Sequence, residues 1–379
     1  MRGDLIQRGV WFRSGEQAPP AFRLVLLNAQ AGVDGREVGD ALGAVLDMLA
    51  GLPEGVLPDL PGMRGREAQR SRRQFAKLTT LLGLGARAFD ASAHYPPLVA
   101  AERPDHLVPL RGFPALPWEA MTSNLAEADV ALQLTAERAA AVDIAAAEVA
   151  QLLAERGLPL RVVATFGGFG RVDRRGWLGF HDGVSNMQAA DRLAALAAPA
   201  DPPWMAGGTY MAFLRLRVDL AAWRSLPRGE QELLVGREKL SGSALTAVDR
   251  SGGVPRPVAG GDFVDPPQST DPLVEASHVH RANQSRASPH APGALRIFRQ
   301  GYEFLEDIGS NGPRLGLNFV SFQRDLGTLQ HLLHLPGWLG DANFGGDPGP
   351  SFITLLAGGL YAVPPRAEPF AGASLLGSP

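Results

Sequence analysis

The sequence predicts an α+β protein in which an antiparallel sheet packs against helices. Segments rich in β-forming residues alternate with segments whose apolar residues recur at helical spacing. The chain has 379 residues, which is enough for about two domains of roughly 100–200 residues each. Its 45 Gly and 31 Pro are typical of a fold with many loops. The order of the elements favours strands and helices segregated into layers.

The first half has the order strand, helix, strand, strand, helix, strand. Residues 23–28 form a Leu/Val-rich strand, and residues 34–52 carry helical apolar spacing that ends before Pro53. Residues 57–73 are rich in Pro and Arg and are expected as a solvated loop, with an anion-binding patch as the alternative. Residues 77–87 predict a strand that runs into a Gly turn, and residues 128–135 predict another strand. A long Ala-rich helix at 137–156 and a strand at 160–169 complete this half.

The second half starts in a similar way, after an Ala/Pro-rich link at 189–203. The expected strands are 208–218, 294–304 and 315–322, and the expected helices are 229–239 and 324–335. Residues 251–292 are polar and rich in Gly, Pro and Ser. A loop of this length inside a compact chain is usually functional or disordered.

Composition excludes several function classes. The chain has no Cys, which rules out disulfides, thiolate metal sites, Cys nucleophiles and covalent haem attachment through CxxCH. The formal net charge of -3 argues against nucleic acid as the main partner. No apolar run reaches the roughly 18 residues of a membrane span, and the first residues lack the apolar core of a signal peptide. We therefore expect a soluble, cytoplasmic protein with no membrane partner.

Two segments stand out as candidates for chemistry. His278 and His280 lie in the long polar segment, with several arginines around them. A lone His is most often structural, but a neutral imidazole beside guanidinium groups suits a metal ligand next to a carboxylate-bearing ligand, and haem fits both. The second segment, Gly179 to Asn186, brackets Asp182 with two glycines. Its simplest interpretation is an Asp-Gly turn.

Taken in order, several motifs resemble the dye-decolorising peroxidase family of haem enzymes. The resemblance covers residues 165–363 well and the N-terminal half loosely. GFHDG at 179–183 resembles the GxxDG signature of the family, and HVHRAN at 278–283 resembles its proximal-histidine segment. RIFRQG at 296–301 resembles the segment with the distal arginine, and GLNFVSFQ at 316–323 resembles the strand that lines the distal pocket.

The resemblance implies two ferredoxin-like domains, residues 1–195 and 196–379. The first would contribute the distal Asp loop, and the second would hold most of one non-covalent haem b. His278 would be the axial ligand of the iron, because a peroxidase keeps the other axial position open. Asp182 would move the peroxide proton, and Arg299 would stabilise the charge of the breaking O–O bond. The implied haem-binding residues are His278, Arg286, Arg296, Arg299, Leu317 and Phe319.

The implied reaction is reduction of hydrogen peroxide with oxidation of a bulky, dye- or phenol-like organic donor. Leu360 stands where the family often has an acid behind the proximal His, and Asp347 is one substitute. Without that acid the ligand is less electron-rich, so a haem or porphyrin carrier or sensor is the alternative function. Three aromatic residues flank the motifs: Trp177, Tyr210 and Tyr302. They would relay electrons or, more simply, pack in the core.

The C-terminal residues 373–379 are similar to the tail by which some family members enter encapsulin shells, but a frayed terminus is the favoured interpretation. A homo-oligomer is left open.

Overall fold

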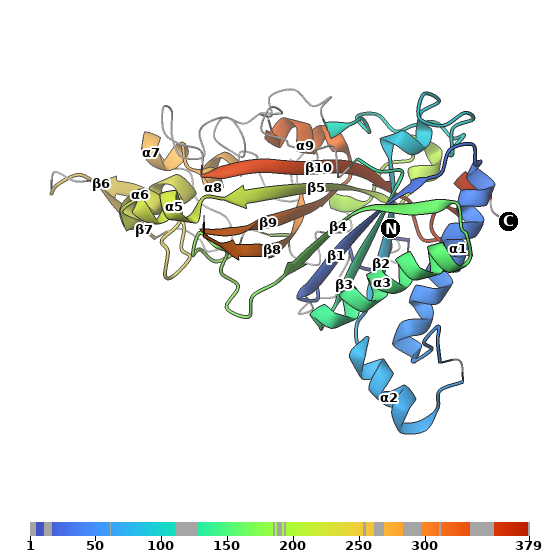
Figure 1. Ribbon diagram of the computed structural model, residues 1–379. Coiled ribbons are helices and arrows are strands. Elements are labelled where there is room, and N and C mark those ends of the chain that lie inside the picture. The colour runs from blue at the N-terminus through green and yellow to red at the C-terminus, as the bar shows by residue number, and fades with distance from the viewer. Residues whose placement is uncertain are drawn as a thin grey trace.

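The structure is a computed structural model of the 379-residue chain (Figure 1). It describes the following residues: 5–10, 17–60, 62–110, 127–184, 186–187, 192, 195–252, 255–260, 269–282, 297–310, 312–333 and 352–377. All statements below about what is absent concern these residues.

The main sheet closes into an antiparallel barrel with the order β1-β3-β2-β10-β5-β9-β8-β4. Its strands are β1 (Ala21–Ala29), β2 (Thr79–Gly85), β3 (Val130–Ala136), β4 (Leu160–Phe169), β5 (Thr209–Val218), β8 (Phe298–Gly309), β9 (Gly312–Gln323) and β10 (Ile353–Val363). Within each half of the chain the strands, counted from that half's first, stand in the order 4-1-3-2. The two halves therefore share the ferredoxin-like arrangement that was predicted.

The halves meet along two narrow seams. One joins β10 to β2 through the pairs Tyr361↔Gly85 and Ala362↔Leu84, and the other joins β4 to β8 through Phe169↔Glu303. Pairing within each half is longer; β8 and β9, for example, pair from Phe298↔Phe322 to Gly309↔Gly312, with one shift of register between Leu305 and Asp307. The division at residues 195/196 stays a prediction, and the thin seams are compatible with it.

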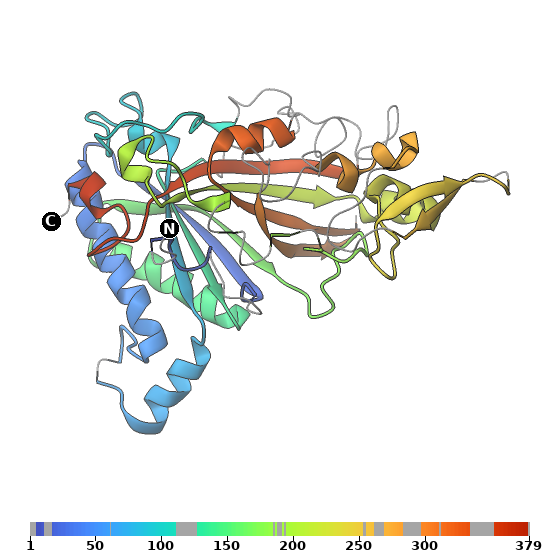
Figure 2. The same ribbon diagram turned by 180° about the vertical axis from the view of Figure 1, so that it is seen from behind.

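Helices cover the outside of the barrel (Figures 1 and 2). The helices are α1 (Gly35–Gly51), α2 (Gly65–Gln74), α3 (Ala139–Glu155), α5 (Leu220–Ser225), α6 (Arg228–Val235), α7 (Pro272–Glu275), α8 (His278–Ala282) and α9 (Leu326–Leu333). Asp34 caps α1, and Glu37 completes a capping box with it, which explains why the predicted start is confirmed. In both views α1 and α3 lie on the sheet of the first half, α9 lies beside β10, and α5 to α8 gather near one end of β5 and β10.

Apolar side chains fill both the inside and the outside of the barrel. The inside holds aromatic residues from both halves, among them Phe22, Phe213, Phe322 and Tyr361. Outside, α1 and α3 pack on the strands of the first half. Leu326, Leu329 and Leu333 of α9 join a separate cluster that lies over the strands of the second half. This second outer face is the part of the fold that carries the predicted site residues.

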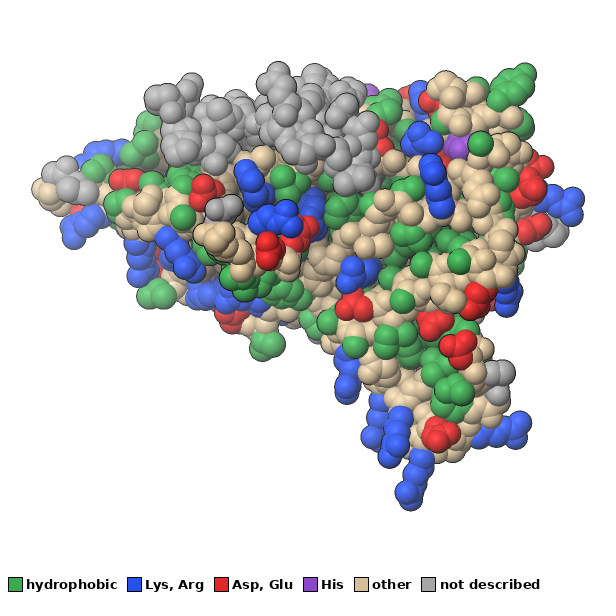
Figure 3. All heavy atoms as spheres, viewed as in Figure 1, with side chains coloured by type: hydrophobic (Ala, Val, Ile, Leu, Met, Phe, Trp, Pro, Cys, Tyr) green, Lys and Arg blue, Asp and Glu red, His purple; other side chains and the backbone are tan. Residues whose placement is uncertain are grey.

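Three predictions of local structure are wrong. Residues 57–73 contain most of α2, whose buried Ala68 and Ser71 lie three residues apart on one face. Figure 3 shows its Arg side chains projecting into solvent. Residues 251–292 are not one loop, because they contain α7, α8 and strand β7 (Arg256–Ala259), which pairs with β6 (Leu245–Asp249).

The third wrong prediction concerns the C-terminus. Residues Ala373–Leu376 form a 3-10 helix, with Ala373 and Leu376 buried against the α1 cluster rather than frayed. This segment would have to detach from the body of the protein before it could dock into a shell.

Within the described ranges, no helix is long and apolar enough to cross a membrane. The same ranges contain no group of three or more His, Asp or Glu side chains arranged to hold a bare metal ion.

Candidate functional site

The outer face of β10, β5, β9 and β8 presents three rows of side chains. Residues paired across antiparallel strands project to the same face, so the register assigns each row. One row is Leu360, Ala212, Ser321 and Arg299; the next is Gly358, Leu214, Phe319 and Gly301; the third is Leu355, Leu216, Leu317 and Glu303. The rows are apolar on β10 and β5 and become polar at β8. Arg299, Leu317 and Phe319, predicted separately, thus share one surface.

A turn carries Asp182 onto this surface. Gly179 and Gly183 both have positive φ, 85° and 72°, which favours glycine at these positions. The Asp182 backbone N–H donates to the Arg174 carbonyl at 2.8 Å, and the Gly183 N–H donates to Asp182 Oδ1 at 2.7 Å. The two glycines that bracket Asp182 therefore form the turn that the sequence predicted.

Arg175 stabilises the same turn through hydrogen bonds. Its guanidinium donates to the carbonyls of Gly179 at 2.8 Å and Lys239 at 2.7 Å, and it lies 2.9 Å from His181 Nε2. These contacts tie the turn to the segment after α6. The position of Asp182 is therefore set by a hydrogen-bonded loop and not by its neighbours in sequence alone.

The Asp182 carboxylate lies directly over Gly301. A Cβ at residue 301 would stand 2.7 Å from Asp182 Oδ2 and 3.3 Å from Leu317 Cδ1. Only a residue without a side chain leaves room for the carboxylate here. Gly301 follows Arg299 by two residues on the same face of β8. Asp182 and Arg299, far apart in sequence, are therefore neighbours in the fold.

Asn186 joins the turn to β8 at Arg299 itself. Its Nδ2 donates to the Arg299 carbonyl at 2.7 Å, and its Oδ1 accepts from the Arg299 N–H at 3.0 Å. The side-chain amide thus takes the place of a neighbouring strand beyond the single β4–β8 pair. Asn186 was noted in the sequence only as the end of the Asp182 motif, and its role as a clamp could not be anticipated there.

The apolar part of the surface is buried. Phe319 is 8% exposed and Leu360 4%, and both pack in the cluster that contains Leu214 and Leu326. Leu317 lies at its border, half-buried. Leu360 lies in the same row as Arg299. An apolar side chain therefore occupies the position at which the family often has an acid.

Helix α8 stands beside this surface, with His278 as its first residue. Ala282 packs against the apolar cluster of Leu317 and Phe319, whereas Val279 packs with Phe180 of the Asp182 turn. His280 is fully buried, and its Nδ1 lies 2.9 Å from Ser277 Oγ. The neighbouring histidines thus differ in environment, because His278 is only partly buried.

Three residues named from the sequence lie outside the described ranges: Arg286, Arg296 and Asp347. Of the three aromatic candidates, Tyr302 and Tyr210 are buried at 2% and 4% exposure, which confirms core packing for them. Trp177 is half-buried, and its Nε1 donates to the Gly316 carbonyl at 3.1 Å. It covers the β8–β9 end of the same surface.

Glu303 was missed in the sequence because nothing in a β-strand pattern marks one carboxyl among several. It is 6% exposed, and among described residues neither oxygen has a hydrogen-bond partner. Its nearest cation is Arg171 Nη1 at 3.9 Å, but Arg171 is engaged by Asp173 at 2.6 Å. Burial raises the pKa of Glu303 to about 7; Arg171 and the Trp177 N–H oppose the rise, and Asp182 and Asp173 add to it.

Replacement of Glu303 by Gln is expected to change how stability depends on pH. Between its ordinary pKa and about 7, Glu303 keeps a proton in the folded protein that the unfolded chain has released. The free energy of unfolding of the wild type therefore falls as pH rises through this range, by up to about 3 kcal/mol. Urea unfolding at pH 5 and pH 8 should show that Glu303→Gln abolishes most of this fall. Asp307→Asn, which removes an exposed carboxyl from the same strand, should retain it.

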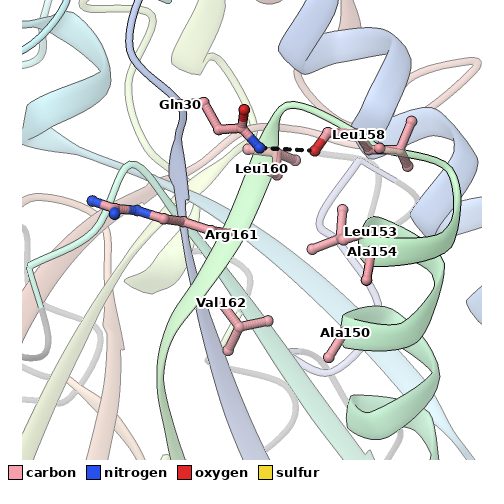
Figure 4. A pocket seen from close by; sticks show the side chains of 9 residues that line it. Gln30, Ala150, Leu153, Ala154, Leu158, Leu160, Arg161 and Val162 are labelled. Atoms are coloured by element: carbon pink, nitrogen blue, oxygen red, sulfur yellow. Dashed lines mark hydrogen bonds between the residues drawn. The ribbon is translucent and has the colours of Figure 1, made fainter.

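A separate pocket lies between α3 and the start of β4 (Figure 4). Its walls are mostly aliphatic, Gln30 Nε2 donates to the Leu158 carbonyl at 3.3 Å, and Arg161 points away from the other side chains. It contains none of the predicted site residues. The chemistry-bearing residues therefore gather at β8 and not here.

Comparison with known proteins decides the family. The model of the Dyp-type peroxidase C-terminal domain matches residues 173–368, more than half of the chain and all of the surface just described. The chain belongs to the Dyp-type peroxidase family.

Relatives and solved structures agree with this family. The chain is 30% identical over 202 residues to the dye-decolorizing peroxidase of Thermobifida fusca and 29% identical over 156 residues to the deferrochelatase of Escherichia coli O157:H7. These segments cover 51% and 39% of this chain but only 43% and 34% of the relatives. The oxyferrous complex of DtpA from Streptomyces lividans has the same fold, with a TM-score of 0.71, 24% identity and coverage of 98% of this chain and 97% of that one.

The described residues fit the haem that membership of the Dyp-type family implies. A haem needs apolar walls, one axial protein ligand and polar groups on its open side. The outer face provides buried Phe319 and Leu214, with Arg299 and the Asp182 carboxylate along one border. His278 heads the helix that packs on this face.

Proposed function

We propose that this Dyp-type protein is a haem b peroxidase that reduces hydrogen peroxide and oxidises a bulky dye- or phenol-like donor. The observation that carries the proposal is the position of Asp182 against Gly301, two residues along β8 from Arg299 and beside an apolar sheet face. A carboxylate and a guanidinium on the same face of a sheet are the pair that a peroxide-reducing site requires.

Each residue has a distinct task in this proposal. Asp182, when ionised, accepts a proton from one oxygen of the peroxide and returns it to the other. Arg299 supplies a permanent positive charge, since a guanidinium does not lose its proton in proteins. With haem bound, Leu317 and Phe319 would help to exclude water from both groups, which would strengthen their electrostatic effect. A haem bound on this face supplies the iron at which the O–O bond breaks.

His278 is the proposed axial ligand, and Arg286 and Arg296 are proposed to face the carboxylates of the haem. In this assignment the second half, residues 196–379, holds the haem and the first half contributes the Asp182 turn. The support is that α8 packs between the apolar cluster of the sheet and the Phe180 side of that turn.

A haem or porphyrin carrier is the second candidate, and Leu360 is the observation that favours it. Leu360 stands where an acid behind the axial histidine was expected, and it is a buried leucine in the row of Arg299. Without an acceptor, an axial imidazole is a weaker electron donor to iron. One relative is named deferrochelatase, and this name is consistent with a porphyrin-directed function for this chain.

Haem reconstitution followed by peroxide addition separates the two functions. The purified protein should bind haem with a Soret band, and hydrogen peroxide should then drive oxidation of a phenolic dye. Haem binding without donor oxidation would favour the carrier, and failure to bind haem would contradict both.

Gly301→Ala is expected to impair the peroxide reaction without unfolding the protein. The new methyl group meets the end of a flexible side chain, so the Asp182 carboxylate moves while the strand stays in register. A displacement of about 1 Å can cost about 10²-fold in rate, measurable by stopped flow in the Soret region. Gly309→Ala on the same strand is the matched control and should react like the wild type.

A further inference from the structure

Glu303 is a buried carboxyl that the proposed mechanism does not use. It lies in the row next to Gly301 on the same face of β8, so about 7 Å of strand separates it from the residue beneath the Asp182 carboxylate. Phe169 and Leu317 pair with it from β4 and β9. The Asp182 turn also reaches it, because a Cβ at Gly176 would stand 3.6 Å from Glu303 Oε1.

The charges that face Glu303 come from one loop. They are Arg171, Asp173 and Asp182; from β4 and β9 its paired neighbours are the apolar Phe169 and Leu317. The single cation, Arg171, forms a charge-paired hydrogen bond with Asp173 and stays 3.9 Å from Glu303. Glu303 is buried and Asp182 is exposed, and the negative charge of Asp182 adds to the rise in the pKa of Glu303 that burial causes.

We propose that Glu303 is a proton store of the pocket, which holds a proton beside Asp182 and passes it to that carboxylate. Reduction of the peroxide follows H₂O₂ + 2 e⁻ + 2 H⁺ → 2 H₂O, with electrons from the organic donor, so the pocket has to be resupplied with protons. In the transfer, neutral Glu303 becomes a carboxylate and the Asp182 carboxylate becomes a neutral acid. Arg171 and Asp173, with side chains 35% and 49% exposed, mark the edge from which solvent reprotonates Glu303.

The arrangement also limits charge repulsion between the two carboxyl groups. A carboxylate at residue 303 would repel the charge of Asp182, whereas a neutral acid does not. Glu303 therefore leaves Asp182 free to accept the peroxide proton and still keeps a second proton within the pocket. This role rests on the peroxidase function proposed above, but the titration of Glu303 can be measured without haem.

Infrared spectroscopy of the haem-free protein tests the storage directly. The carbonyl stretch of a protonated carboxylic acid should disappear with a midpoint near the pKa of about 7 that burial gives Glu303. Glu303→Gln should remove this band, and Asp307→Asn should retain it. Asp182→Asn should lower the midpoint by about one unit, because it removes a like-charged neighbour.

A purely structural carboxyl would not respond to Asp182 in this way. Titration of the band in the acidic range, its persistence in Glu303→Gln, or an unchanged midpoint in Asp182→Asn would each overturn the inference.

In the haem-loaded protein, Glu303→Gln should bind haem normally but slow donor oxidation by about 10²-fold, the low end for a positioned proton-transfer group. Wild-type turnover in this variant would also overturn the inference. If instead the haem-loaded wild type shows no donor oxidation while the infrared results hold, the peroxidase function fails and the coupling between Glu303 and Asp182 stands.

Discussion

His278→Ala is expected to abolish or strongly weaken haem binding. If His278 is the axial ligand, its loss removes the one bond from the protein to the iron and leaves only the apolar contacts and the proposed contacts with arginines. Titration of the apo protein with haem, followed in the Soret region, should show little or no His-ligated spectrum in this variant. A wild-type spectrum would disprove the assignment of His278.

His280→Ala serves as the control, although the structure indicates that this variant also loses stability. His280→Ala should retain haem, but His280 is fully buried beside Ser277, so its removal leaves a cavity and costs stability. His331→Ala is a cleaner control, because His331 lies exposed on α9. Thermal unfolding of all three apo proteins distinguishes loss of the ligand from loss of the fold.

Asp182→Asn and Arg299→Leu are expected to retain haem but to slow the peroxide reaction through different effects. Removal of a preorganised charge such as Arg299 typically costs about 10²–10³ in rate. Removal of a positioned general acid–base group such as Asp182 typically costs about 10²–10⁴. Stopped-flow mixing with hydrogen peroxide measures both losses.

The pH dependence separates the two roles. Asp182 acts only when ionised, so the wild-type rate should fall as acid protonates this carboxylate. Asp182→Asn should flatten that acid limb, whereas Arg299→Leu should lower the rate and leave the limb in place. Wild-type rates in both variants would contradict the proposed roles and favour the haem carrier.

Local patterns predicted much of the fold. Residues 34–52 carry their own helix signals, an Asp cap and apolar spacing, and α1 spans Gly35–Gly51. Residues 160–169 form β4 with the predicted bounds. The prediction for residues 57–73 is wrong because a charged sequence shows no obvious apolar stripe. Two small buried residues, Ala68 and Ser71, are enough to pack α2 against the rest of the protein.

The residues of the candidate site also fall into two groups: those that the sequence predicted and those that only the structure revealed. Motif order brought Asp182, His278 and Arg299 to attention, and the turn glycines at 179 and 183 are visible in the sequence because positive φ favours glycine. Gly301, Asn186 and Glu303 could not be recognised, since each acquires its role from a partner distant in sequence. The space above Gly301 matters only because Asp182 occupies it.

The sequence by itself determined most of the elements and the order of the motifs, through which it resembles a family with ferredoxin-like halves. These depend on local backbone preferences and on motifs that are contiguous in the chain. Only the tertiary structure decided that the two halves close into one barrel, that the Asp182 turn docks on β8, and that Glu303 is buried next to it. Barrel closure, docking and burial arise from strand register and from the exclusion of water, and both depend on contacts between segments that the sequence keeps far apart.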